Sequence, residues 1–146
     1  MGTVGVEHVL VTPLKRIPLA GGDVMHGMKH GDHGYVGFGE VYFSMIEAGA
    51  IKAWKRHLRM TLNLVVPIGS VQFVFTDEHG SMREEVVGVE QERYVRLTVP
   101  PGIWFGFKGV FSPYSMLMNC ADIPHDPTEI QRKGLEEIVF NWETRR

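Results

Sequence analysis

The sequence predicts an all-β protein, and three observations lead to this fold class. Glycine and proline recur at short intervals along the 146 residues. The segments between them have the length of strands and are rich in β-branched and aromatic residues. The intervening loops contain residues suited to tight turns. Short strands joined in this way are typical of a β-sandwich or a β-barrel.

Each predicted strand ends where the sequence favours a turn. The clearest turn signals separate neighbouring strands at residues 47–50 (EAGA), 67–69 (PIG), 77–80 (DEHG) and 100–102 (PPG). The predicted strands, in chain order, cover residues 39–46, 51–59, 62–66, 71–76, 83–89, 94–99, 104–107 and 115–119.

One short helix is predicted near the end of the chain. Asp126 is suited to the N-cap, Pro127 to the first helical position, and Glu129 to the capping-box position. Apolar residues continue at loosely helical spacing, at Ile130, Leu135 and Ile138.

The length suits a single domain covering residues 1–146. We divide it into an N-terminal strand and arm (about 1–37), a barrel (about 38–120), and a C-terminal helix and tail (about 121–146). The apolar runs are far shorter than the ~20 residues that cross a bilayer, and no signal-peptide segment is recognisable, so we expect a cytoplasmic protein without membrane contact. A formal charge of -2 argues against nucleic-acid binding.

Cysteine and histidine usage gives little support for a metal site. The single cysteine, Cys120, has apolar neighbours and is predicted to be a buried structural thiol. His26, His30 and His33 lie in a glycine-rich stretch that disfavours a rigid helix, so we interpret them as solvated loop histidines rather than metal ligands.

The segment at residues 51–59 (IKAWKRHLR) is unusual because four basic side chains and a histidine occupy a predicted strand. Alternation sends Lys55, His57 and Arg59 to one face and Trp54, Arg56 and Leu58 to the other. A cationic face on the solvent side would be an ordinary charged row. The same face inside a barrel mouth would bind an anion such as a diphosphate, or alter the pKa of an acid–base group.

Five motifs, in order, resemble those of one family. They are residues 38–42 (FGEVY), residues 51–57 (IKAWKRH), the glycine-containing hairpin from Val65 to Asp77, residues 99–107 (VPPGIWFGF) and residues 125–129 (HDPTE). Together they make the chain similar to the dTDP-4-dehydrorhamnose 3,5-epimerases, the RmlC-like cupins.

The resemblance implies a jelly-roll β-barrel (double-stranded β-helix), a homodimer with exchanged N-terminal strands, and a pocket for a nucleotide-linked 4-keto sugar. It also implies chemistry without a cofactor. A base removes the proton next to the ketone, polar groups hold the enolate, and an acid returns the proton. The related 3,4-ketoisomerases act through the same kind of enolate intermediate.

The active-site positions depart from the family pattern. The family's base histidine falls on Lys55, its preceding arginine on Lys52, and its acid tyrosine near Met118, while the segment with the base-supporting aspartate is absent. Among the metal-ligand positions of cupins only His57 is retained, with Lys55, Leu62 and Phe105 at the others, so we expect no bound metal.

We therefore select His57, Lys55 and Tyr42 as candidate catalytic residues. The candidate substrate-binding residues are Phe38, Glu40, Lys52, Trp54, Arg59, Trp104 and Phe105. The function expected is an epimerase or isomerase of a nucleotide-linked 4-keto-6-deoxy sugar, in deoxysugar or surface polysaccharide biosynthesis. The alternatives are a non-catalytic sugar-nucleotide-binding cupin, in which these side chains only hold the ligand, and a metal-dependent cupin, which the ligand positions argue against.

Overall fold

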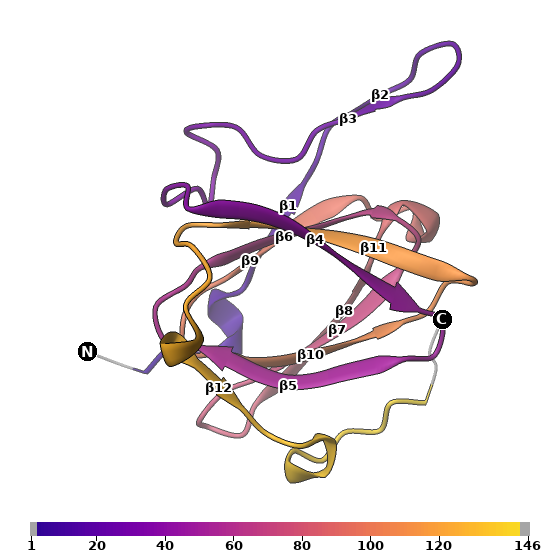
Figure 1. Cartoon of the computed structure of the whole chain (residues 1–146). Coiled ribbons are helices and arrows are strands. Elements are labelled where there is room, and N and C mark those ends of the chain that lie inside the picture. Colours follow the sequence, from indigo (N-terminus) through magenta and orange to yellow (C-terminus); the bar gives the residue numbers. More distant parts are fainter. Residues whose placement is uncertain (1–2, 144–146) are drawn as a thin grey trace.

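Two five-stranded antiparallel sheets face each other in the computed structural model, which describes residues 3–143 (Figure 1). The first sheet has the order β1 (Leu10–Pro13), β9 (Val95–Val99), β6 (Leu62–Ile68), β11 (Tyr114–Ala121), β4 (Glu40–Glu47). The second has the order β12 (Ile130–Arg132), β5 (Ile51–His57), β10 (Trp104–Gly109), β7 (Val71–Thr76), β8 (Met82–Val87).

The predicted all-β jelly-roll class is confirmed. The eight predicted strands correspond to β4 through β11. One edge strand of each sheet, β1 and β12, comes from outside residues 38–120. Both ends of the chain therefore help to build the barrel.

The main core fills the space between the sheets. Every residue of β7 and of β9 is buried, which explains why these strands are so rich in valine and phenylalanine. The core continues from Phe73 and Phe75 across to Leu64, Leu97 and neighbouring apolar residues of the first sheet. The hairpin from β6 to β7 turns at Gly69, whose φ of 86° suits glycine and whose Cα faces the side chain of Ser115.

The N-terminal arm includes a hairpin of β2 (Arg16–Ile17) and β3 (Val24–Met25) that projects away from the barrel (Figure 1). The loop that follows is held to the first sheet by Arg96, a β9 side chain that is only 1% exposed. Its guanidinium donates to the carbonyl oxygens of Gly27 and His33 at 2.7 and 2.8 Å.

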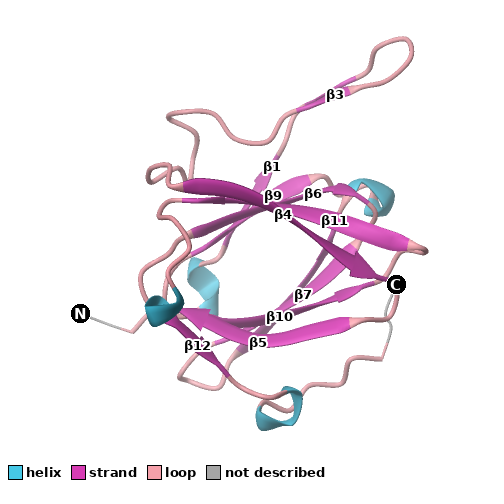
Figure 2. Ribbon diagram, in the orientation of Figure 1, coloured by secondary structure: helices cyan, strands magenta, loops and turns pink. Residues whose placement is uncertain are grey.

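The four helices of the described residues are all short 3-10 turns (Figure 2): η1 (Val6–His8), η2 (Val89–Gln91), η3 (Pro127–Glu129) and η4 (Leu135–Glu137). The predicted cap is present, because Asp126 accepts a hydrogen bond from the Thr128 amide and Pro127 begins η3. The predicted continuation through Ile130 is not helical. Ile130 instead begins β12, because its backbone pairs with the exposed edge of β5 at His57.

A second apolar cluster lies on the outer face of the second sheet. Trp54, Val74 and Trp104 are covered there by the C-terminal segment, whose Trp142 lies 5.5 Å from Trp54 between ring centroids. Strand alternation is thus as predicted, with Trp54 outside and His57 inside. Within residues 3–143, no helix is long and apolar enough to span a membrane.

Candidate active site

A cavity of about 430 Å³ opens between the two sheets. Its walls combine apolar core side chains with a small set of polar ones, the composition typical of a small-molecule site. The lining comprises Tyr42 and Ser44 from β4, Lys52 to Lys55 from β5, Leu62 and Leu64 from β6, Phe73 from β7, Phe105 and Phe107 from β10, Leu117 and Asn119 from β11, and Arg132 and Lys133.

The charged groups of the described lining are all cationic: Lys52, Lys55, Arg132 and Lys133. Lys52 donates through Nζ to the carbonyl oxygen of Met45 at 3.1 Å, and the Lys133 ammonium lies 4.7 Å from the centroid of the Trp104 ring. Such a wall attracts anions and disfavours cations or metal ions.

A bulge in β5 explains why Lys52 and Lys55 both reach the cavity although an odd spacing separates them. In the pairing with β10, Phe105 is opposite Lys55 but the next residue, Gly106, is opposite Ala53. Trp54 is therefore the extra residue, and the alternation of side chains reverses at this point.

Lys55 is the most enclosed of the four cations. Its strand neighbours are Phe105 on β10 and Arg132 on β12. Burial lowers the pKa of the Lys55 ammonium below its usual value, and the nearby charges of Arg132 and Lys52 lower it further. At a given pH, a larger fraction of Lys55 is therefore the neutral amine than for a lysine in water.

His57 and Glu129 form a buried hydrogen-bonded pair beside this wall. Each side chain is 2% exposed, and His57 Nδ1 contacts Glu129 Oε2. The other carboxylate oxygen, Oε1, accepts from the backbone amides of Arg59 and Met60 at 2.8 and 3.1 Å. The glutamate is thus held by three donors at the end of β5.

The protonation of this pair follows from the pKa directions. Burial lowers the pKa of the His57 imidazole, against the opposing effect of Glu129. Burial raises the pKa of Glu129, but the hydrogen bonds from His57, Arg59 and Met60 outweigh it and leave the pKa below its usual value. A neutral imidazole beside a carboxylate donates from Nδ1, so Nε2 carries the lone pair. Nε2 is buried and has no hydrogen-bond partner among the described residues.

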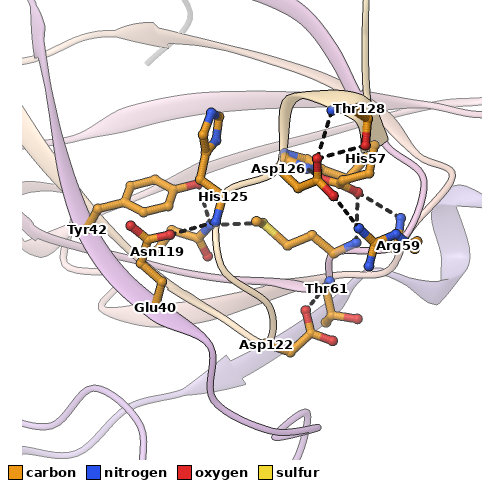
Figure 3. A network of polar contacts seen from close by, with 12 residues as sticks. Glu40, Tyr42, His57, Arg59, Thr61, Asn119, Asp122, His125, Asp126 and Thr128 are labelled. Atoms are coloured by element: carbon orange, nitrogen blue, oxygen red, sulfur yellow. Dashed lines mark hydrogen bonds and ion pairs between the residues drawn. The ribbon is translucent and has the colours of Figure 1, made fainter.

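Polar contacts connect this pair to the opposite wall (Figure 3). Asn119 donates through Nδ2 to the Tyr42 hydroxyl oxygen at 3.0 Å, and the same nitrogen lies 3.7 Å from the sulfur of Met60. The Met60 amide in turn binds Glu129. Tyr42 is the one phenol in the described lining, and its own proton has no acceptor among the described residues.

We find no metal centre in the part of the chain that the structure describes: no three His, Cys, Asp or Glu side chains gather there as a metal ion would require. His57 has Lys55 and Phe105 as its neighbours, and neither ammonium nor phenyl groups ligate metals. The His30 ring packs against Tyr35 at 5.2 Å between centroids.

No family model matches the sequence. Solved structures nevertheless share the fold at low identity. They include a sugar 3,4-ketoisomerase from Thermoanaerobacterium thermosaccharolyticum in complex with TDP (16% identical, TM-score 0.75, covering 88% of this chain and 90% of that one). They also include the dTDP-6-deoxy-D-glucose-3,5-epimerase RmlC from Legionella pneumophila (13%, TM-score 0.74, 92% and 77%).

The similarity is higher to a dTDP sugar isomerase from Desulfovibrio desulfuricans G20. It is 34% identical with a TM-score of 0.89, over 94% of this chain and 92% of that chain. The chain belongs to the RmlC-like family. A curated relative, the probable low-salt glycan biosynthesis epimerase Agl13 of Haloferax volcanii, is 29% identical over 85 residues. That match covers 53% of this chain and 53% of the relative, so it spans about half of either protein.

In this RmlC-like protein, the cavity brings together five of the residues selected from the sequence. Tyr42, Lys52, Trp54, Lys55 and Phe105 belong to the lining, although the indole ring of Trp54 packs in the outer apolar cluster. His57 does not belong to it. Its ring lies behind Phe105, nearly parallel to that ring and 6.3 Å away between centroids.

The four other selected residues lie outside the cavity. Phe38 is 63% exposed. Glu40 accepts a hydrogen bond from the His125 amide, and Arg59 pairs with Asp126 beyond the end of β5. Trp104 faces the outer apolar cluster because its neighbour Phe105 faces inward, and strand side chains alternate.

Sequence reasoning missed two important polar groups. Glu129 was considered only as a helix-capping residue and part of the late motif, whereas it binds His57. Its place in a motif shared with RmlC-like proteins was the signal that could have found it. Asn119 was treated only as the end of a strand, although alternation from the inward-facing Leu117 points to it. Met118, where the family's acid tyrosine aligns, is not part of the lining.

Proposed function

We propose that this protein is an epimerase or isomerase of a nucleotide-linked 4-keto-6-deoxy sugar, acting by proton abstraction next to the ketone without a cofactor. The biological setting that we propose is deoxysugar or surface-polysaccharide biosynthesis. The observation that carries the proposal is the cavity itself, in which a cationic wall faces Tyr42 and the His57–Glu129 pair lies directly behind.

The cationic wall suits a nucleoside diphosphate. Lys52, Arg132 and Lys133 carry charges at the cavity and can bind phosphate oxygens through charge-assisted hydrogen bonds. The apolar surface from Phe107 and Leu117 leaves room for the deoxysugar, whose C–H faces pack well on aromatic and aliphatic groups. A neutral sugar alone would not need four cations.

The remaining polar groups support proton transfer. His57 has no hydrogen-bond partner at Nε2 among the described residues, and Glu129 holds its Nδ1 proton, which is how an oriented general base is arranged. Lys55 also lines the cavity, where its amine can act on the C4 carbonyl group of the sugar. Tyr42, on the opposite wall, is the candidate that returns the proton.

The relatives support the same class. The similar solved protein is a dTDP sugar isomerase, and the curated relative is a probable epimerase of glycan biosynthesis. Both isomerisation and epimerisation begin with removal of the proton on a carbon next to the ketone.

One observation favours the alternative, a non-catalytic sugar-nucleotide-binding cupin. His57 Nε2 is buried behind Phe105 and is not part of the cavity surface. In such a protein, Lys55 and the other cations would hold the ligand and His57 would only order the wall.

Proton NMR of dTDP-4-keto-6-deoxyglucose in D2O tests the proposal. We expect the wild-type protein to remove the C3 or C5 proton signal faster than an enzyme-free control. His57→Asn should abolish the exchange while TDP binding changes less than about threefold. Binding without exchange in the wild-type protein would establish the alternative, and neither binding nor exchange would exclude both.

A homodimer and a cytoplasmic location form part of the proposal. The hairpin of β2 and β3 projects from its own barrel, and Val41, Phe43 and Met45 of the edge strand β4 are 40%, 59% and 49% exposed. Apolar groups on an exposed edge strand are typical of strand exchange or pairing between subunits. Sedimentation velocity should give a dimer for the wild-type protein and more monomer for Phe43→Glu.

A further inference from the structure

Lys55 differs from the other cavity cations in being partly buried, because Lys52, Arg132 and Lys133 are exposed. No hydrogen bond or ion pair connects its ammonium group with any described residue. Lys52, three positions earlier on the same strand, is exposed and donates to the Met45 carbonyl. Glu129 is the acidic group whose charge acts on the pKa of Lys55, but it is already bound by His57 and two backbone amides.

The surroundings of Lys55 are unfavourable for a charged ammonium. Its cross-strand partners are an aromatic ring, Phe105, and another cation, Arg132. Leucines from β6 and β11 line the same cavity. Like charges directly opposite each other destabilise a sheet, and desolvation without a partner adds to the cost.

These conditions are those that make a lysine nucleophilic. A lysine amine attacks carbonyl carbons when an apolar site or a neighbouring cation lowers its pKa. For Lys55 burial is the first cause of that lowering, and Arg132 and Lys52 are the next. The amine therefore lines a partly apolar cavity, the one in which the proposed substrate would bind.

We propose that Lys55 is a covalent catalyst that forms an imine with the C4 ketone of the sugar. This inference rests on the proposed function and narrows it. The neutral Lys55 amine adds to C4, the C4 oxygen takes up one proton from that amine and one from solvent and leaves as water, and a protonated imine remains.

The imine makes proton transfer easier than the ketone does. Its nitrogen is positively charged, so when a base takes the proton from C3 or C5 the C–H electrons form a C=C bond and the C=N electrons move onto nitrogen. Return of a proton on the other face restores the imine. Water then adds to C4, the C–N bond breaks, and Lys55 leaves as the free amine. One water is released and one is consumed, and no oxidant or reductant is needed.

This step selects epimerisation over 3,4-ketoisomerisation. Moving the ketone from C4 to C3 through an imine would leave nitrogen on a saturated C4, and that C–N bond does not hydrolyse. The imine is therefore productive only when the ketone stays at C4 and a neighbouring carbon is inverted.

The test combines covalent trapping with deuterium exchange. The protein is incubated with dTDP-4-keto-6-deoxyglucose and sodium cyanoborohydride, which reduces imines to stable amines, and the adduct is located by peptide mass spectrometry. We expect the adduct on Lys55 in the wild-type protein and in Lys15→Met, an exposed lysine outside the cavity lining, and none in Lys55→Arg. A parallel incubation in D2O follows the C3 and C5 protons.

Lys55→Arg separates the imine from simple charge. Arginine retains the cation but cannot form the imine, so we expect TDP affinity within about threefold of wild type and a loss of exchange of more than about 100-fold. If charge alone mattered, the arginine variant would keep most of the exchange, and the imine would be wrong.

The two readouts separate failure of the imine from failure of the proposed function. Deuterium exchange without an adduct, or an adduct on another lysine, overturns the imine and leaves the function standing. An adduct on Lys55 without exchange upholds the imine and overturns the proposed proton transfer. Absence of both overturns both.

Discussion

Two buried or partly buried cations, one in each sheet, occupy opposite environments. Arg96 in β9 is 1% exposed, donates to two backbone carbonyl oxygens and lies 3.6 Å from Asp32. Lys55 in β5 is partly buried, faces a cavity and has no acceptor among the described residues. Burial lowers the pKa of both.

The difference shows that burial of a charge does not by itself mark a functional site. Arg96 uses its charge to hold the arm against the barrel: its two terminal nitrogens have acceptors in the arm, and only Nε has no partner among the described residues. The Lys55 ammonium has no hydrogen-bond acceptor among the described residues. A ligand bound in the cavity would supply one. Polar groups whose partners are missing are the ones for which we infer chemistry.

The largest expected effect is on stability. Arg96→Met leaves the carbonyl oxygens of Gly27 and His33 without their donor and removes the cation that lies 3.6 Å from Asp32, and we expect a loss of about 3 kcal/mol in the free energy of unfolding. Lys55→Met removes a poorly solvated charge and should change it by less than about 0.5 kcal/mol or stabilise the protein. Urea denaturation measures both free energies of unfolding.

The control is the surface variant Arg16→Met, whose partner Asp23 is on the exposed hairpin. Its free energy of unfolding should stay within about 0.5 kcal/mol of wild type. Equal losses for Arg96→Met and Lys55→Met would refute the contrast.

The same comparison extends to tyrosines. Tyr42→Phe removes the one phenol of the described cavity lining, and we expect turnover to fall about 100-fold with little change in TDP binding. Tyr94 already donates to the His26 carbonyl at 2.8 Å, away from the cavity, so Tyr94→Phe should keep turnover. Steady-state kinetics of both variants checks this, and a greater loss in Tyr94→Phe would contradict it.

Carboxylates provide a third pair. Glu129→Gln keeps the shape but allows the amide to donate to His57 Nδ1, which moves the imidazole proton to Nε2 and blocks the base. We expect about tenfold slower turnover with an altered pH profile. Glu85, which pairs with Arg83 and Arg93 outside the cavity, provides the matched control in Glu85→Gln. Unchanged turnover in Glu129→Gln would show that the buried pair is structural.

The smallest effect concerns alkaline pH. Because the folded pKa of Lys55 is below the unfolded value of 10.5, the unfolded chain binds more protons between these two values, and stability rises with pH across that interval. The advantage of Lys55→Met over wild type should therefore shrink as pH rises towards 10.5. Urea midpoints at several pH values measure this. A trend of the opposite sign for Lys55→Met would mean that Lys55 is stabilised as the cation.

Several features of the fold could be read from the sequence because they depend on local patterns. Alternating apolar residues and turn glycines placed β4 to β11, and the alternation of Trp54 and His57 between opposite faces was predicted correctly. Of the residues selected from the sequence, Tyr42, Lys52, Trp54, Lys55 and Phe105 belong to the cavity lining, whereas Phe38, Glu40, His57, Arg59 and Trp104 do not.

Other features of the fold and the site depend on contacts between distant segments and could not be predicted from the sequence. The bulge at Trp54 depends on how β5 pairs with β10, and strand register between segments far apart in sequence is not a local property. The helix expected after Asp126 ends after one turn because residues Ile130 to Arg132 pair with the free edge of β5 and form β12. That pairing is also what brings Arg132 beside Lys55 and Glu129 onto His57.

The sequence by itself determined the all-β class, the family resemblance and the cationic strand, because residue type and spacing are sufficient for these. The tertiary structure decided which of those charges are satisfied. Whether Arg96 or Lys55 has a partner depends on acceptors contributed by loops and strands more than 60 residues away, as Gly27 and His33 are from Arg96. Only folding brings such groups into contact.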